Sequence, residues 1–211
     1  DQELSFVMDK IEKPLIPIVK SMKETGIKID VERLNELSKK YHIELAFLEK
    51  KIWKIVGEEF NISSPKQLSE MLFVKMGLKP KNQKKTSSGG FSTKESELEK
   101  LREEHPIAGL ILEYRELSEL LGTYIDTIPT QVDGNNRLHA DFLQAGTTTG
   151  RMASSNPNLQ NIPNKTELGR EIRKSFITEK GWRLVSFDYS QIELRIAAFL
   201  SGDKKLIEIL Q

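Results

Sequence analysis

Residues 184–203 constrain the fold more than any other stretch of the chain. They read LVSFDYSQIELRIAAFLSGD, which is an apolar run typical of a strand, then a carboxylate, then an amphipathic helical pattern. This order predicts that Asp188 lies at the carboxyl end of a strand, at the rim of a sheet where ligands commonly bind. Its carboxylate and the backbone carbonyl of Tyr189 are oxygen ligands of the kind that Mg²⁺ prefers. Alternatively, Asp188 or Ser190 caps the following helix, because both residue types are favoured at N-caps.

Composition limits the class of protein. With 211 residues, the chain is long enough for one or two domains with a core, and it contains no cysteine for a disulfide or a thiolate metal site. We find no apolar run long enough to span a membrane and no signal-peptide pattern, so we expect a soluble, cytoplasmic protein without a membrane partner. The net charge is only +1, so any surface that binds nucleic acid must come from a local cluster of charge.

One such cluster lies between residues 75 and 94. It holds six lysines and no acidic residue, and it includes the polar run TSSGG. Lysines beside hydroxyl-rich backbone suit contacts with phosphate, which give affinity without reading sequence. The alternative is a solvated surface loop, as most lysine runs are. The lysines are Lys75, Lys79, Lys81, Lys84, Lys85 and Lys94.

The first 130 residues have a helical pattern. Apolar residues recur every three or four positions from 34 to 55, which predicts a long amphipathic helix with Asp30 as its N-cap. Capping-box patterns begin at Ser64 and at Ser92 and predict two further helices. A fourth stripe, from Ile111 to Tyr124, predicts another helix that ends near Pro129. These stripes indicate core packing rather than a cofactor site.

The pattern changes after the turn signal at 133–136. Residues 137–142 alternate like a strand, and His139 has no second histidine nearby, so we interpret it as structural. The proline- and asparagine-rich stretch 156–164 predicts a loop, followed by a short helix over 167–174. A turn at 179–181 then leads into the strand predicted at 182–188.

Three segments of the chain match a known pattern in the same order. The first reads TTTGRMASSNPNLQNIP at 147–163, the second GREIRKSF at 169–176 and the third DYSQIELR at 188–195. Together they resemble the family A DNA polymerases, the bacterial DNA polymerase I group, and the third resembles motif A of that family. Three ordered matches at the expected spacing are far more specific than one short motif.

This resemblance implies an α+β fold in two parts. Residues 1–130 are expected to form a long-helix thumb with a lead-in helix and a basic tip loop near 75–94. Residues 131–211 are expected to form the first part of an antiparallel-sheet palm that includes motif A.

The resemblance also assigns roles within motif A. Asp188 corresponds to a catalytic, metal-binding aspartate and Tyr189 to a second metal ligand. The implied cofactor is Mg²⁺, at a two-metal site that residues outside this chain would complete. Gln191 and Glu193 correspond to nucleotide-binding positions, and Glu193 to the glutamate that blocks a ribose 2′-hydroxyl and selects dNTP over rNTP. The alternative for Glu193 is an ordinary solvated residue of the helix.

A second set of residues is expected to bind primer–template DNA. Arg151 matches the arginine with which the family tests pair shape in the minor groove at the primer terminus. Amide side chains nearby match contacts with sugar, phosphate or base edges, although such side chains also commonly bond loop backbone. The expected set is Arg115, Thr123, Tyr124, Arg151, Asn158, Gln160 and Asn161, with Lys81, Lys84 and Lys85 of the basic loop.

Two positions depart from the family pattern. Family members commonly carry lysines within the segment 115–124, where this chain has Glu119 and Leu121. We therefore expect fewer phosphate contacts from this helix and a larger share from the basic loop.

The resemblance implies that the chain is part of a DNA-directed DNA polymerase, a nucleotidyltransferase of DNA replication and repair that binds primer–template DNA and dNTP. Two-metal phosphoryl transfer needs more than one carboxylate. We therefore expect a second polypeptide or chain segment that carries the fingers and the rest of the palm. The alternative is a non-catalytic DNA-binding module. The intact motif A favours the first, because a protein that only binds DNA needs neither a metal aspartate nor a sugar gate.

Overall fold

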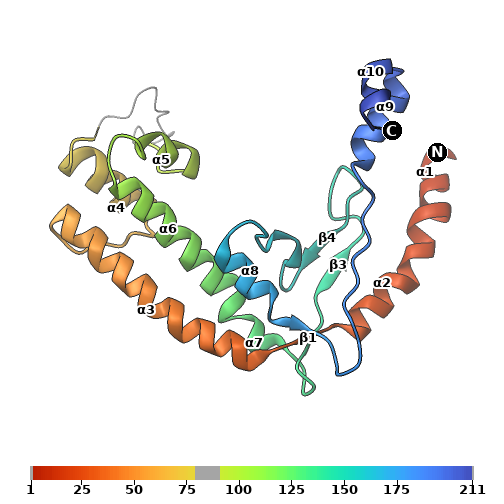
Figure 1. Ribbon diagram of the computed structural model, residues 1–211, viewed down its shortest axis with the longest axis horizontal. Helices are drawn as coiled ribbons and strands as arrows, with labels where there is room; N and C mark the ends of the chain where they lie inside the picture. Colours follow the sequence, from red (N-terminus) through yellow and green to blue (C-terminus); the bar gives the residue numbers. More distant parts are fainter. Residues whose placement is uncertain (1, 79–90, 211) are drawn as a thin grey trace. The chain divides into compact units, whose positions relative to one another are not determined.

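The computed structural model describes residues 2–78 and 91–210. Internal contacts divide the chain into two compact units, unit 1 at residues 1–177 and unit 2 at residues 178–211. The chain is α+β, with long helices and two small antiparallel sheets in the described residues (Figure 1). The functional division into a thumb at 1–130 and a palm from 131 stays a prediction. The boundary after residue 177 divides the chain by its internal contacts and not by function.

Unit 1 opens with a lead-in segment of three consecutive helical pieces, α1 (Gln2–Val7), the π-helix η1 (Met8–Glu12) and α2 (Lys13–Thr25). Gly26 ends α2 at a φ of 58°, a left-handed value that costs glycine little. The chain then enters strand β1 (Ile27–Ile29).

Helix α3 (Val31–Val56) confirms the long helix predicted from the apolar stripe. The carboxylate of Asp30 accepts a hydrogen bond of 2.9 Å from the backbone N–H of Arg33, so the predicted N-cap is also confirmed. Gly57 ends the helix with a φ of 90°. The buried face consists of Leu34, Leu37, Tyr41, Leu48 and Ile52, whereas Ile55, at the end of the predicted stripe, is exposed.

Further helices follow α3, and one of them, α6, packs beside it in Figure 1. Ser64 caps α4 as predicted, but the side chain of Gln67 bonds the N–H of Asn61, so only half of that capping box forms. The capping box predicted at Ser92 is wrong, because Lys94 is the N-cap residue of α5. These elements are α4 (Pro65–Ser69), η2 (Glu70–Lys75), α5 (Glu95–Leu101), α6 (Ile107–Leu120), η3 (Leu121–Ile125) and α7 (Ile128–Gln131).

The core of unit 1 lies between these helices and β1. Its largest fully buried side chains come from every one of the long apolar stripes, so the stripes are core packing, as the sequence predicts. They include Ile29, Leu34, Ile52, Leu72, Leu98, Ile111, Leu121 and Ile125.

Strand β1 is the centre of a three-stranded sheet in the order β2-β1-β5. It pairs antiparallel with β2 (Arg137–Leu138) and with β5 (Phe176–Ile177). A second sheet is a hairpin in which β3 (Asp141–Leu143) pairs with β4 (Ala153–Ser155). The single strand predicted over 137–142 is therefore wrong. The chain passes from one sheet to the other at His139 and Ala140, and the imidazole of His139 contacts the backbone carbonyl of Lys23 in α2.

A loop with the short 3₁₀ helix η4 (Leu159–Asn161) follows β4 and leads to α8 (Glu167–Arg173), which confirms the short helix predicted there. The carboxylate of Glu171 on α8 bonds Arg33 on α3 and also Lys174. The bond to Arg33 ties α8, which follows the loop at 156–163, to the first turn of the long helix, and the bond to Lys174 is local.

Unit 2 contains α9 (Ile192–Ser201) and α10 (Lys204–Leu210). The predicted turn at 179–181 is confirmed by a hydrogen bond from the N–H of Trp182 to the carbonyl of Glu179. The predicted strand at 182–188 is wrong, because these residues are exposed and carry no strand assignment. A strand exists only with a hydrogen-bonded neighbour, and an apolar run in the sequence does not supply one. Among the described residues, each helix is too short or too polar to cross a membrane.

Candidate functional site

The expected site residues fall into two groups, one in each unit. In unit 2, Asp188 lies in the exposed segment before α9. Its neighbours are also open to solvent, with Phe187 92% and Tyr189 80% exposed. The carboxylate is therefore accessible to a cation.

The helix that follows begins at Gln191, which has a left-handed φ of 50° and makes no side-chain cap bond. Because the N-cap is Gln191, neither Asp188 nor Ser190 occupies the capping position that the alternative interpretation gives them. Instead, the carbonyl of Ser190 accepts a bond of 2.8 Å from Nε of Arg195. Glu193 is exposed in the first turn of α9, where the positive end of the helix dipole favours a carboxylate.

The two groups that the sequence predicts as metal ligands, the Asp188 carboxylate and the Tyr189 carbonyl, are oxygen donors of the kind that Mg²⁺ prefers. Within residues 2–78 and 91–210, no group of three or more His, Cys, Asp or Glu side chains comes together as a metal site. The residues present fit one part of a magnesium site and not a whole one.

In unit 1, the loop at 156–163 holds three of the expected DNA-binding amides, and its contacts position two of them. The phenol of Tyr124 donates a hydrogen bond of 2.9 Å to the carbonyl of Asn158, which joins two members of the expected set. Burial raises the pKa of Tyr124, and the charge of Glu119 adds to the effect, so the phenol keeps the proton that it donates.

The amide side chains in this loop also bond backbone. Asn158 Oδ1 accepts from the N–H of Gln160 at 3.0 Å, and Gln160 Nε2 donates to the carbonyl of Met152 at 3.1 Å. Both contacts fit the alternative interpretation, in which amides satisfy loop backbone. Asn161 and Thr123 are exposed.

Arg151 is exposed and lies in the connection between β3 and β4. Thr147 closes this connection, because its hydroxyl donates to the Arg151 carbonyl at 2.7 Å and contacts the hydroxyl of Thr149 at 3.2 Å. Gly150 has a φ of 77°, which favours glycine at the tight point of the loop. The TTTGR segment is therefore a compact loop with its arginine toward solvent.

The guanidinium of Arg115, which is expected to contact DNA, bonds another part of the protein. Its guanidinium is partly buried and donates to the carbonyl and the hydroxyl of Thr93, in the segment before α5. Burial lowers the pKa of Arg115. The side chain thus braces α6 against the segment before α5.

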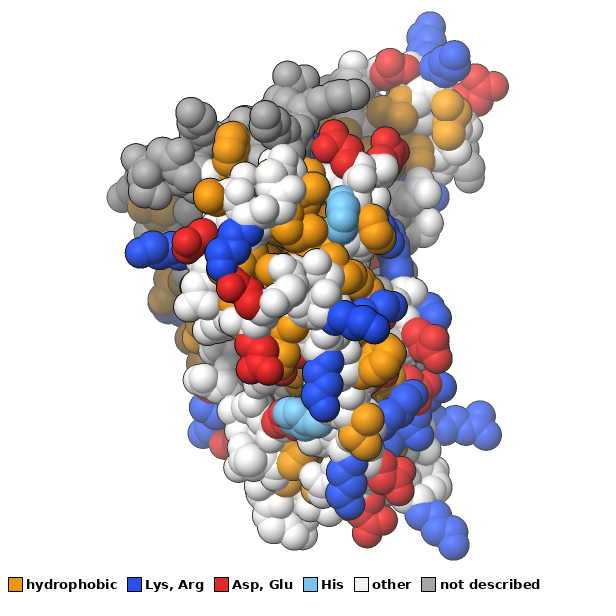
Figure 2. All heavy atoms as spheres, turned by 90° about the vertical axis from the view of Figure 1, so that its left-hand side faces the viewer, with side chains coloured by type: hydrophobic (Ala, Val, Ile, Leu, Met, Phe, Trp, Pro, Cys, Tyr) orange, Lys and Arg blue, Asp and Glu red, His pale blue; other side chains and the backbone are white. Residues whose placement is uncertain are grey.

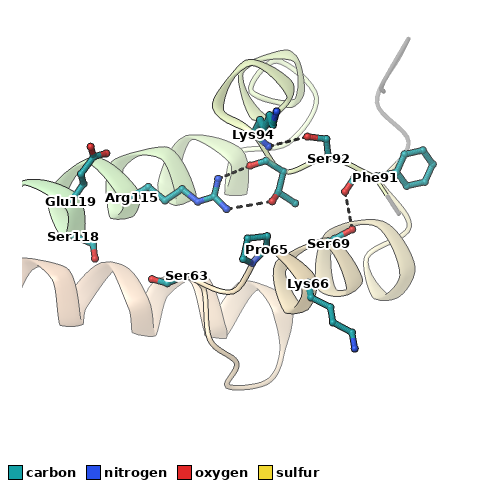
Figure 3. Close-up of a pocket in the computed structure, with 11 residues that line it drawn as sticks. Ser63, Pro65, Lys66, Ser69, Phe91, Ser92, Lys94, Arg115, Ser118 and Glu119 are labelled. Atoms are coloured by element: carbon teal, nitrogen blue, oxygen red, sulfur yellow. Dashed lines mark hydrogen bonds between the residues drawn. The ribbon is translucent and has the colours of Figure 1, made fainter. Parts of the chain in front are cut away.

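This brace lies at the edge of a cleft of about 1060 Å³ between α4, α6 and the start of α5 (Figure 3). Two lysines, Lys66 and Lys94, and several hydroxyls line the cleft together with Glu119. Lysines Lys81, Lys84 and Lys85 lie outside the described residues. Lys66 lies in the first turn of α4 and lines the cleft from the side opposite Lys94, so no local sequence pattern marks it (Figure 3).

Charge on the surface of the molecule is mixed. In Figure 2, acidic and basic side chains are interspersed among exposed apolar ones on the face shown. This agrees with the net charge of +1 and leaves local groups, such as the two lysines of the cleft, as the positions where phosphate contact can arise.

Comparison with known proteins decides the family. The family model described as DNA polymerase family A matches residues 31–211. The chain belongs to DNA polymerase family A. It is 48% identical to the DNA polymerase I of Synechocystis sp. over 207 residues, which are 98% of this chain and 21% of that protein. It is 46% identical to the thermostable DNA polymerase I of Thermus thermophilus over 212 residues, which cover 100% of this chain and 25% of that one.

Among solved structures, this family A chain is similar to the POL domain of Pol1 from M. smegmatis, in complex with a DNA primer–template and dNTP. The TM-score is 0.87 at 35% sequence identity, over 99% of this chain and 37% of that one. The chain thus spans about a fifth to a quarter of the length of the curated relatives.

Proposed function

We propose that this chain forms the DNA-binding part and the first catalytic part of a DNA-directed DNA polymerase. The observation that carries the proposal is the intact motif A, Asp188 to Arg195, within a family A match over residues 31–211. The similar POL domain of Pol1, which is in complex with a primer–template and dNTP, supports these two ligands.

In this proposal, each unit has its own task. Unit 1 contacts the template–primer through Arg151, the loop at 156–163 and the lysines of the cleft. In unit 2, Asp188 and the carbonyl of Tyr189 would hold Mg²⁺, which supplies positive charge to the transferred phosphate when it is bound. Glu193 excludes a ribose 2′-hydroxyl by occupying the space that the extra oxygen needs.

The test is reconstitution of templated synthesis with the remaining polymerase region of a close relative. We expect Asp188→Asn to lower kcat by orders of magnitude, because the amide keeps the shape of the side chain and removes the charge that holds the cation. Glu208→Gln, on the exposed side of α10, is the matched control and should leave kcat unchanged.

Near-normal turnover of the Asp188→Asn assembly would show that Asp188 is not a metal ligand. The second candidate function, a non-catalytic DNA-binding module, predicts a different result. The chain would then bind duplex DNA with the same affinity whether residue 188 is Asp or Asn, and no assembly would extend a primer.

A further inference from the structure

The lead-in segment is fixed to the β3–β4 hairpin by side chains at both ends of α2. At the start, Nε2 of Gln144 donates to the carbonyl of Glu12 at 3.0 Å and to its carboxylate at 2.8 Å. Near the end, Nζ of Lys23 forms an ion pair with Oδ1 of Asp141. Because these contacts lie at opposite ends of α2, they fix the orientation of the helix on the hairpin as well as its position.

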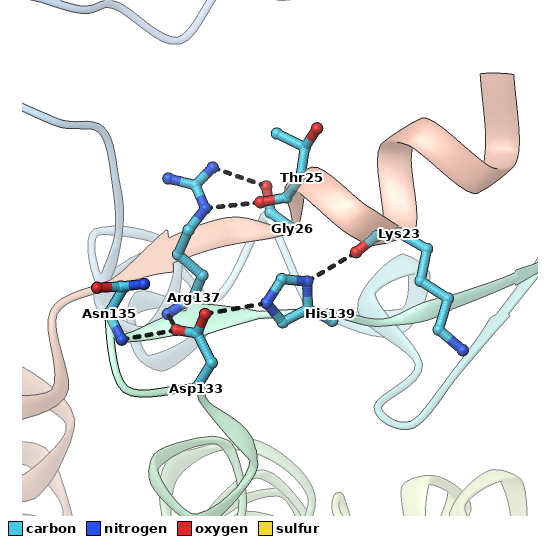
Figure 4. A network of polar contacts seen from close by, with 7 residues as sticks. All are labelled: Lys23, Thr25, Gly26, Asp133, Asn135, Arg137 and His139. Atoms are coloured by element: carbon cyan, nitrogen blue, oxygen red, sulfur yellow. Dashed lines mark hydrogen bonds and ion pairs between the residues drawn. The ribbon is translucent and has the colours of Figure 1, made fainter.

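The end of α2 is capped by strand β2 and the residues after it. The guanidinium of Arg137 donates to the carbonyls of Thr25 at 2.6 Å and Gly26 at 3.0 Å (Figure 4). The imidazole of His139 contacts the carbonyl of Lys23 at 2.7 Å. These are the carbonyls that a helix leaves without partners at its carboxyl end. The capping holds Lys23 in place, so that its side chain reaches Asp141.

The packing at this point is tight. A Cβ at Gly26 would lie 2.6 Å from the carbonyl oxygen of Leu138 and 2.7 Å from the His139 ring. The end of α2 therefore cannot slide along β2 without breaking these contacts.

Asp141 also holds the end of β4 and the start of the loop that follows it. Its Oδ1 pairs with Lys23, and its Oδ2 accepts a hydrogen bond of 2.9 Å from Nδ2 of Asn156. Asn156 has a left-handed φ of 56° and begins the loop that carries Asn158 and Gln160. Asp141 is also opposite Ser155 in the hairpin, whose connecting loop carries Arg151.

We propose that Asp141 is a positioning residue for template–primer binding: it joins Lys23 of α2 to Asn156, and so fixes the loop at 156–163, whose Gln160 donates to the carbonyl of Met152 beside Arg151. This proposal rests on the proposed function, since it takes Arg151 as a contact with DNA. In this proposal, the lead-in segment stabilises the position of the DNA-binding loops. Lys23 and Asp141 lie outside motif A and outside the segment 147–163, and Asn156 lies within that segment.

The test measures the affinity of the 211-residue chain for a fluorescent primer–template by anisotropy, well below the unfolding temperature. We expect Asp141→Ala to raise Kd about fivefold, a coupling within the range usual for residues that share partners. Lys23→Met, which keeps the stem and removes the charge, should act similarly, whereas Lys23→Arg should retain wild-type affinity. Lys20→Met is the control, because its partner Glu24, at 3.7 Å, lies on the same helix.

A double-mutant cycle with Arg151→Ala separates positioning from general stability. If Asp141 acts through the Arg151 loop, its effect on Kd disappears in the Arg151→Ala background. The proposal is overturned if Asp141→Ala lowers only the unfolding temperature, or if its effect on Kd is undiminished without Arg151. If Arg151→Ala itself leaves Kd unchanged, the proposed DNA contact of Arg151 is wrong, and the positioning role is wrong with it. A fall in affinity for Arg151→Ala but not for Asp141→Ala overturns the positioning role alone.

Discussion

At the scale of single residues, the candidate site residues are of two kinds. Some side chains hydrogen-bond the protein's own backbone, and others are exposed to solvent. Arg115, Asn158 and Gln160 bond backbone, so their loss changes local structure as well as any contact with DNA. Asp188 and Glu193, by contrast, are exposed at the start of α9. Substitutions at these two positions should therefore change chemistry with little effect on folding.

The first prediction concerns Glu193 in the reconstituted polymerase. We expect Glu193→Ala to lower the ratio of kcat/KM for dNTP to that for rNTP, because removal of the side chain opens space for a 2′-hydroxyl. The ratio is measured for both nucleotides in wild type and variant, with Glu208→Ala on α10 as the control. An unchanged ratio would make Glu193 an ordinary helix residue.

The second prediction concerns Glu119, which lines the cleft of Figure 3 beside Arg115. Glu119→Lys should tighten primer–template binding, because it removes a repulsive charge and adds a phosphate contact. The log–log salt slope should steepen by about 0.9, the value for one contact on B-form DNA. Glu36→Lys, exposed on α3 and away from the cleft, makes the same change in net charge. An equal effect of both variants would indicate long-range attraction and not a contact.

At the scale of elements, the sequence predicts structure best where a residue contacts another residue only a few positions away. The N-cap of α3 predicts a clear cost: Asp30→Ala should lower the free energy of unfolding by about 1 kcal/mol. The reason is the loss of the 2.9 Å bond to the N–H of Arg33. Urea unfolding followed by circular dichroism measures it, and Asp30→Ser, which still caps, should stay close to wild type. A loss as large for Ser as for Ala would contradict the capping role.

A carboxylate at the turn before β2 links stability to pH. The backbone N–H of Arg137 lowers the pKa of Asp133, with further bonds from Asn135 and His139. A lowered folded pKa means that this stabilisation is complete above the ordinary carboxyl pKa of about 4. It is lost as pH falls through the lower folded value. We expect the urea midpoint of Asp133→Asn to fall less than that of wild type below about pH 4; equal falls would show that the charge of Asp133 adds nothing.

The difference between local and long-range interactions explains which parts of the structure could be predicted from the sequence. Helix α3 was predictable because its apolar period and its cap lie within the helix. The strand predicted at 182–188 is wrong because strand structure depends on a neighbour that local sequence does not specify. For the candidate site, the family motifs predict Asp188 and Arg151, whereas the ion pair of Lys23 with Asp141 joins distant segments and has no local pattern.

At the scale of the whole molecule, a net charge of +1 means that attraction to DNA cannot come from bulk charge. The described phosphate candidates are few and local: Arg151 on the hairpin loop, and Lys66 and Lys94 at the cleft. Binding should thus depend on specific lysines rather than on their total number.

The last prediction tests this with two pairs of lysines that carry the same charge. Lys66→Ala with Lys94→Ala should weaken primer–template binding similarly for every sequence, and should flatten the log–log salt slope by up to about 1.8, two contacts' worth. The control pair, Lys39→Ala with Lys50→Ala, removes equal charge from exposed positions on α3 that do not line the cleft. Anisotropy across a salt series measures both. If the control pair flattens the slope as much as the cleft pair, affinity follows total charge and the cleft is not the phosphate contact.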